Sequence, residues 1–169
     1  MSGAVWRRAV DIQIKSADAW RRVKEIWIRN ADVWRLVHQR SYALVISTDT
    51  TDYKVRTSLL AAGWDGIVPI DVTLTINSGI YVFASATSTY AIDFEQALPA
   101  GSGKTLVTNN GKIRGKGGVG GEGGDNLAAT AGTAAGHAIR IYEDIDIDNT
   151  NGEIFGGGGG GGGGGMVTQ

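Results

Sequence analysis

The chain has 169 residues, no cysteine and a formal net charge of −1 at neutral pH. The absence of cysteine excludes a disulfide framework and any thiolate metal site. Glycine is unevenly distributed, since 23 of the 27 glycines lie between Gly101 and Gly165. No apolar stretch has the length of a signal peptide or a membrane span. We therefore expect a protein that is soluble or leaves the cell by lysis, with at least two parts of different character.

The charge is divided between these parts. The first forty residues hold nine Lys and Arg against four Asp and Glu, whereas residues 41–169 hold seven against thirteen. Such a division indicates that the two parts meet different partners. Chance segregation of solvated charge is the alternative.

A 14-residue repeat runs through the basic segment and places a tryptophan before an arginine in each of three copies. Apolar and polar residues alternate within each copy, which is the period of a half-buried strand, and Ser-Ala-Asp and Asn-Ala-Asp supply turn residues. The pattern predicts a three-stranded meander over residues 1–41. Its small apolar face needs a partner, because three short strands bury little surface. The candidate residues for docking to another protein or subunit are Trp6, Trp20, Trp27, Trp34, Arg8 and Arg22. Burial of the tryptophans in the meander's own core is the alternative.

Residues 42–100 predict a compact, β-sandwich-like domain with one short helix. The segment Tyr42–Ser47 has the pattern of a strand. Thr51 and Asp52 are expected to cap a helix from about Tyr53 to Ala62, and Gly63 is expected to end it.

A hairpin is predicted in the second half of this segment. Apolar residues alternate with polar ones from Ile70 to Ile76, and a second apolar run follows at residues 80–83. The intervening Asn-Ser-Gly tripeptide at residues 77–79 has the composition of a tight turn.

Residues 101–169 predict a glycine-rich repeat domain. The segment Thr108–Gly115 has a counterpart 41 residues later at Asn149–Gly156, and each reads as a strand, an Asn-Gly turn and a short strand. Repeated units of this kind stack. Stacking brings the following glycine tracts together, and extended glycine helices pack closely because no Cβ intervenes. We therefore expect Gly156, Gly157, Gly158, Gly159, Gly160, Gly161, Gly162, Gly163, Gly164 and Gly165 to pack in an ordered polyglycine II layer.

Several segments resemble glycine-rich tail-fibre and tail-tip proteins of tailed bacteriophages. The resemblance lies in residues 61–66, 72–78, 98–102 and 109–118 and in the N-terminal tryptophan repeat. Residues 101–169 are further similar to the polyglycine receptor-binding adhesins of T-even phages. The resemblance implies an all-β virion protein that attaches the phage to its host, without catalysis. The partners that the resemblance implies are other tail proteins and a bacterial surface receptor, either a polysaccharide or an outer-membrane protein. It also implies a homo-oligomer, with a trimer favoured.

Short motifs that suggest other chemistry are incomplete. Residues 101–105 end in Gly-Lys-Thr, but the phosphate-loop pattern needs glycine where Leu98 stands and a helix afterwards. We expect a loop that leads into a strand. One copy of a calcium-binding nonapeptide at residues 120–128 lacks the neighbouring copies that would complete a cage. Asp144, Asp146 and Asp148 favour a solvated strand face over a cation site.

No spacing of His, Ser, Asp or Glu indicates a catalytic unit, so no catalytic residue, metal or cofactor is expected. The leading hypothesis is a virion protein of a tail fibre or tail tip that is made in the host cytoplasm and mediates attachment. One alternative is a connector that carries a separate adhesin. The second is nucleic-acid binding by the basic N-terminal segment, where tryptophan and arginine are interleaved.

Overall fold

The computed structural model describes residues 13–16, 19–22, 25–30, 33–123 and 129–164. The chain divides into two compact units, Met1–Arg40 and Ser41–Gln169. The boundary expected between residues 100 and 101 falls inside the second unit. Strands dominate both units, and the described residues contain a single short helix, so the all-β expectation is confirmed.

The described residues of the first unit form two antiparallel strand pairs. Strand β1 (Gln13–Ser16) pairs with β2 (Ala19–Arg22), and β3 (Glu25–Asn30) pairs with β4 (Val33–Gln39). The prediction of one three-stranded meander is therefore wrong for the described residues. Alternation of apolar and polar residues indicates strands without specifying which strands pair.

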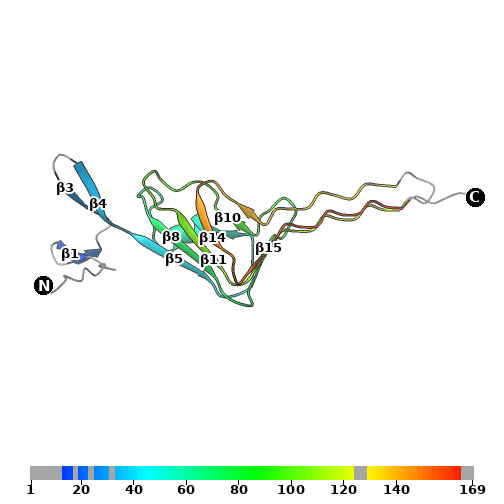
Figure 1. Ribbon diagram of the computed structural model, residues 1–169, viewed down its shortest axis with the longest axis horizontal. Coiled ribbons are helices and arrows are strands. Elements are labelled where there is room, and N and C mark those ends of the chain that lie inside the picture. Colours follow the sequence, from blue (N-terminus) through cyan, green and yellow to red (C-terminus); the bar gives the residue numbers. More distant parts are fainter. Residues whose placement is uncertain (1–12, 17–18, 23–24, 31–32, 124–128, 165–169) are drawn as a thin grey trace, which may run out of the picture. The chain divides into compact units, whose positions relative to one another are not determined.

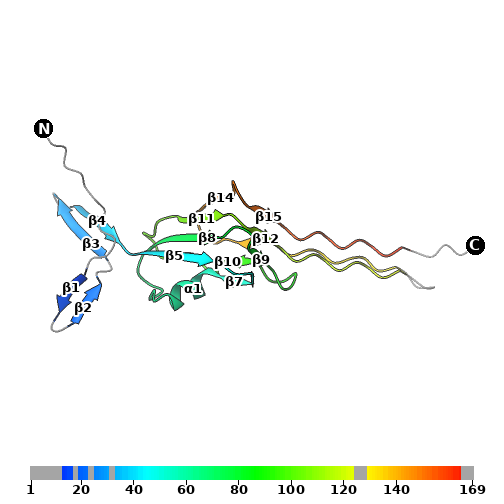
Figure 2. The ribbon, with the colours of Figure 1, turned by 90° about the horizontal axis from the view of Figure 1, so that it is seen from below.

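The second unit is a three-sided solenoid of parallel strands (Figures 1 and 2). Each of the first three circuits of the chain adds one strand to all three sheets, and the last circuit adds strands to the first and second sheets. The first sheet has the order β5 (Ser41–Ile46), β8 (Asp71–Ile76), β11 (Thr105–Asn109), β14 (Ile145–Asp148). The second has the order β6 (Thr50–Thr51), β9 (Tyr81–Phe83), β12 (Lys112–Arg114), β15 (Glu153–Phe155). The third has the order β7 (Tyr53–Lys54), β10 (Ile92–Asp93), β13 (Ile139–Arg140).

This topology corrects two expectations. The second unit is not a sandwich, and β8 and β9 do not form a hairpin, because they lie in different sheets. The Asn77–Gly79 segment is a corner of the solenoid. Strands with one buried face show the same alternation in either architecture, so the pattern located the strands and left their pairing open.

The core lies inside the solenoid, where like residues stack from one circuit to the next. In the first sheet Leu44, Leu74 and Val107 are in register and buried. In the second sheet Val82 and Ile113 are in register and fully buried. Burying an aliphatic side chain of this size stabilises a fold by roughly 1.5–3 kcal/mol. The stacked apolar residues therefore hold adjacent circuits together.

Helix α1 (Val55–Ala61) packs on this core through Val55 and Leu59, which lie four residues apart on one face. The chain leaves the helix at Gly63 with φ of +91°, so the predicted stop is confirmed. The predicted cap is wrong, because Lys54 occupies the N-cap position and makes no side-chain capping bond. Instead the Thr57 N–H donates to the Glu95 carboxylate over 2.8 Å, so a residue from the next circuit stabilises the first turn.

The repeated Asn-Gly units stack as predicted. Lys112 on β12 is in register with Glu153 on β15, 41 residues further along the chain. The preceding strands of the two units, β11 and β14, also pair in parallel. The corner between the sheets has little space, since a Cβ on Gly111 would lie 2.4 Å from the Ile80 carbonyl oxygen. Glycine is therefore required there by close approach of the neighbouring circuit.

Candidate functional site

Three extended segments leave the solenoid and run side by side (Figures 1 and 2). They are residues 115–123, residues 129–136 and residues 156–164, and together we call them the glycine bundle. The first and third segments continue directly from β12 and β15, which are paired in parallel. The solenoid therefore sets the register at which these two segments meet.

Backbone hydrogen bonds join the three segments in a cycle that repeats every third residue. The N–H groups of Gly118 and Gly121 donate to Gly158 and Gly161, from the first segment to the third. The third segment donates from Gly157, Gly160 and Gly163 to Gly136, Thr133 and Thr130. The second segment in turn donates from Thr130, Thr133 and Gly136 to Glu122, Val119 and Lys116. These bonds, from 2.7 to 3.1 Å, make each segment both a donor and an acceptor.

In the first and third segments, glycine is required at one position in three. A Cβ on Gly118 would lie 2.1 Å from the Thr133 oxygen, and one on Gly160 would lie 1.9 Å from the Val119 oxygen. The same holds at Gly121, Gly157 and Gly163. Only a residue without a side chain fits so near the common axis, as at the axis of the collagen triple helix.

The second segment is a component that the sequence did not predict. It contains alanine and threonine as well as glycine, and so lacks the compositional signal of the other two. Its threonine hydroxyls add to the bundle, because Thr133 Oγ1 accepts from the Val119 N–H and Thr130 Oγ1 accepts from the Glu122 N–H, each over 2.7 Å. A spacing of three between Thr130, Thr133 and Gly136 is the signal that could have identified it.

The first segment carries an outward row of side chains. Lys116, Val119 and Glu122 recur at the three-residue spacing, and all are exposed, Val119 by 69%. The bundle thereby presents one cationic, one apolar and one anionic side chain in a line. Sequence reasoning overlooked this row, because the flanking glycines dominated the pattern.

The predicted docking residues are distributed over the first unit. Trp20 and Arg22 lie on β2, Trp27 on β3 and Trp34 on β4. Trp6 and Arg8 lie outside the described residues, as does Gly165 of the predicted glycine layer. The backbone pairs Trp27 with Leu36 and Trp34 with Arg29 in the same hairpin.

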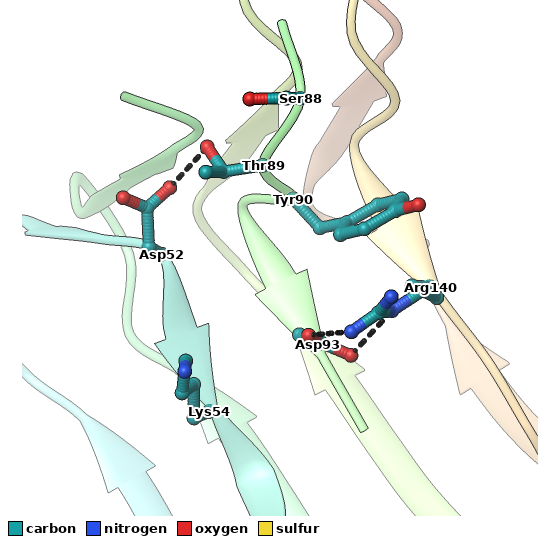
Figure 3. Close-up of a pocket in the computed structure, with 7 residues that line it drawn as sticks. All are labelled: Asp52, Lys54, Ser88, Thr89, Tyr90, Asp93 and Arg140. Carbon is teal, nitrogen blue, oxygen red and sulfur yellow. Dashed lines mark hydrogen bonds and ion pairs between the residues drawn. The ribbon is translucent and has the colours of Figure 1, made fainter. Parts of the chain in front are cut away.

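A polar pocket with a volume of about 190 Å³ lies on the solenoid beside the third sheet (Figure 3). Its lining comprises Asp52, Lys54, Ser88, Thr89, Tyr90, Asp93 and Arg140. Arg140 Nε donates to Asp93 Oδ1 over 2.8 Å, a second bond joins Arg140 Nη2 to Asp93 Oδ2, and the guanidinium carbon lies 4.5 Å from the centre of the Tyr90 ring. The pair joins β10 to β13 and fixes the position of the aromatic ring.

Hydrogen bonds keep both carboxylates of the pocket ionised. Burial alone would raise the pKa of Asp93, but bonds from Arg140 and the Glu95 N–H, with the charge of Arg140, lower it overall. Burial likewise opposes ionisation of Asp52, and bonds from Ser85 and Thr89 lower its pKa. The bond to Asp93 is the main cause of the raised pKa of Arg140. These carboxylates act as structural acceptors.

The outer face of the second sheet carries a ladder of aromatic and charged residues. Arg114 lies 5.3 Å from the centre of the Tyr81 ring and 5.9 Å from that of Phe155. Glu153 forms ion pairs with Lys112 over 3.3 Å and with Arg114 over 3.9 Å. All these side chains are at least partly exposed, so each ion pair stabilises the fold only slightly.

The remaining motifs have structural positions. The loop at residues 101–104 leads into β11, which confirms the predicted strand entry, and a neighbouring pocket of about 240 Å³ is lined by Glu143 and Asp144. Asp146 and Asp148 are exposed on β14, and hydrogen bonds from Thr150 lower the pKa of Asp148. Among the described residues, no cluster of three or more His, Asp or Glu side chains has the arrangement of a metal site.

Residues 41–169 match the family model of the phage tail fibre adhesin Gp38. The chain belongs to this family. The match covers the solenoid and the glycine bundle of this tail-fibre protein, and the hairpins of the first unit precede it. Comparison of the chain with curated proteins and with solved structures found no match. Within the described residues, no helix is both long and apolar enough to cross a bilayer.

Proposed function

We propose that this chain is the host-attachment protein of a phage tail fibre, that the first unit docks to the fibre, and that the glycine bundle carries the surface that contacts the bacterium. Family membership supports the attachment role. The receptor-contact role of the bundle rests on one observation. The three segments are joined by a cycle of hydrogen bonds, which holds the outward row of Lys116, Val119 and Glu122 in fixed register.

An ordered bundle is suited to adhesion because its surface is organised before the receptor arrives. Ordering a residue costs roughly 1–2 kcal/mol in backbone entropy, and glycine loses the most. Hydrogen bonds at every third residue and close backbone packing offset that cost in the bundle. The segments therefore act as packed polyglycine II helices, and receptor binding costs little further ordering.

The first unit is assigned the docking role by its charge and composition. Its excess of basic residues contrasts with the acidic remainder of the chain, and tryptophan and arginine are enriched in protein interfaces. Trp20, Arg22, Trp27 and Trp34 are the described candidates for contact with another tail protein. The fibre location makes catalysis unnecessary for the proposed role, and a polysaccharide or outer-membrane protein is the proposed receptor.

The test compares two exposed valines. Purified full-length protein carrying Val119→Asp, in the outward row, is expected to bind host cells at least about tenfold more weakly than wild type, as expected when a contact worth about 1.4 kcal/mol is lost. The matched control is Val45→Asp, at a side chain that is 58% exposed on the first sheet. It is expected to bind normally.

Equal binding by both variants and wild type would exclude the outward row as the contact surface. Full-length protein that fails to bind host cells but captures another tail protein would support the connector role instead. Retained binding to the fibre by Val119→Asp separates a defect in adhesion from a defect in assembly.

A further inference from the structure

An asparagine precedes a glycine at two corners of the solenoid, where the first sheet gives way to the second. The pairs are Asn110 with Gly111 and Asn151 with Gly152, and we call residues 109–111 the inner corner and residues 149–152 the outer corner. Packing requires the second glycine as it requires the first, since a Cβ on Gly152 would lie 2.4 Å from the Asn109 carbonyl oxygen. Each asparagine is therefore followed by a residue with no side chain to shield its backbone nitrogen.

An asparagine in this setting reacts with its own backbone. The glycine nitrogen attacks the asparagine Cγ, the new C–N bond replaces the bond from Cγ to Nδ2, and ammonia leaves with the proton that the glycine nitrogen gave up. The resulting succinimide ring takes up one water molecule and opens at either carbonyl, to give aspartate or isoaspartate. The attack requires a glycine N–H that can lose its proton and a side chain that can turn toward it, so hydrogen bonds to either group prevent it.

The inner corner is restrained on several sides. The Gly111 N–H donates to Asn109 Oδ1 over 3.1 Å, and the Gly111 carbonyl oxygen accepts from the Glu153 N–H of the next circuit over 2.9 Å. The Asn110 N–H donates to the Ile76 carbonyl oxygen over 3.0 Å. Gly111 is also buried. The nucleophilic nitrogen is therefore engaged and its peptide unit is fixed between two circuits.

The outer corner is one residue longer. Strands β11 and β14 pair at a separation of 40 residues, Thr105 with Ile145, whereas β12 and β15 pair at a separation of 41. Asn149 is the counterpart of Asn109, but it lies three residues before the glycine instead of two. Its Oδ1 accepts a hydrogen bond from the Asn109 amide over 2.7 Å. The extra residue thus removes the side-chain bond that restrains the inner glycine.

The reacting groups of the outer corner are correspondingly accessible. The Gly152 N–H has a long bond of 3.4 Å to the Asn149 carbonyl oxygen of its own turn. Asn151 is exposed, and its side chain makes no hydrogen bond within the described part of the chain. Strands β14 and β15 are the last of their sheets, so no further described strand covers this corner.

We propose that Asn151 is a site of spontaneous covalent modification, at which the folded chain converts its own asparagine to aspartate and isoaspartate with water as the only co-reactant. Asn110 is preserved by the restraints of the inner corner. Either product adds a negative charge to the outer corner. Isoaspartate also carries the main chain through the side-chain carbon, which lengthens the backbone by one methylene.

The added methylene lies beside a tight contact. The Gly152 backbone packs against Asn109, and the next N–H, from Glu153, donates to the Gly111 carbonyl oxygen over 2.9 Å. A longer backbone displaces one or both. Ageing is therefore expected to loosen the start of β15, from which the third segment of the glycine bundle continues. A loss of host binding on ageing would rest on the proposed function, whereas the reaction itself does not.

The test follows both asparagines in the same molecule. Full-length protein is incubated in mildly alkaline buffer, and peptide mass spectrometry measures conversion at Asn110 and Asn151, with isoaspartate identified by isoaspartyl methyltransferase. A parallel sample in urea gives the rate of each dipeptide without the fold. We expect similar rates in urea and at least tenfold faster conversion of Asn151 than of Asn110 in the folded protein. Equal conversion of the two in the folded protein would overturn the proposal, as would an intact Asn151 after the unfolded sample has reacted.

Asn151→Ala is the matched control, because alanine cannot form the succinimide. Aged wild type is expected to show faster amide hydrogen exchange at Glu153 than fresh wild type, and aged Asn151→Ala is expected to match its fresh sample. Equal acceleration in both proteins would overturn the assignment of the change to Asn151. Binding to host cells is measured on the same samples. Conversion of Asn151 with unchanged binding would leave the modification site standing and would count against an attachment role of the third segment.

Discussion

The α-carbon of Gly157 lies so near the backbone of Lys116 that an added Cβ would be 1.9 Å from the Lys116 carbonyl oxygen. That oxygen accepts a hydrogen bond from the Gly136 N–H over 2.8 Å, and the Gly136 oxygen accepts one from the Gly157 N–H over 3.0 Å. The three segments of the bundle therefore meet at Gly157, where the third segment leaves the solenoid.

Gly157→Ala should loosen the base of the bundle. The methyl group forces the first and third segments apart, and overpacking of this kind costs about 1–3 kcal/mol. Gly158→Ala is the adjacent control, because a Cβ there meets nothing within 4 Å. We expect faster amide hydrogen exchange at Gly160 and Gly163 in Gly157→Ala only. Similar exchange in both variants would show that the segments are not packed as described.

Asn109→Ala should destabilise the solenoid at its corner. The buried Asn109 amide donates to Asn149 Oδ1 over 2.7 Å, and its Oδ1 accepts from the Gly111 N–H over 3.1 Å. Removing the amide leaves the buried Gly111 N–H unpaired, at a cost of about 1–3 kcal/mol in the free energy of unfolding. Asn151→Ala, at an exposed corner position, is the control. Urea denaturation that finds the two variants equally stable would contradict this role.

The ion pair between Asp93 and Arg140 should make stability depend on acid. The folded-state pKa of Asp93 lies below the ordinary value of 3.8. The pair therefore stabilises the fold fully above that value, and the contribution is lost as the pH falls through the lowered pKa. We expect Asp93→Asn to be less stable than wild type at neutral pH and to lose less stability on acidification to about pH 2. Parallel urea titrations at both pH values measure this difference, and identical losses would exclude the pair as a source of acid sensitivity.

Local patterns predicted the elements that depend on local interactions. Alternation of apolar and polar residues located β5 and β8. The glycine at position 63 correctly predicted where helix α1 ends. The 41-residue repeat predicted the stacking of Lys112 on Glu153, because an internal repeat carries information about residues distant in the chain.

Features that depend on distant partners were not predictable in this way. Asp52 reads as a helix cap, but its carboxylate holds Ser85 and Thr89 from the next circuit. Arg140 lies 47 residues from Asp93, with no repeat to relate them. The second segment of the glycine bundle was missed because it is not glycine-rich. Its threonine hydroxyls supply part of the hydrogen bonding in the bundle.

The central claim is that residues 156–164 are ordered through packing in the glycine bundle. Backbone amide relaxation of the intact, isotopically labelled protein tests it most directly, because order parameters separate a packed backbone from a freely moving one. We predict order parameters for Gly157, Gly160 and Gly163 near the value of about 0.85 that is typical of rigid backbone. Values below about 0.6 at all three glycines, with well-ordered strands in the same sample, would contradict the claim.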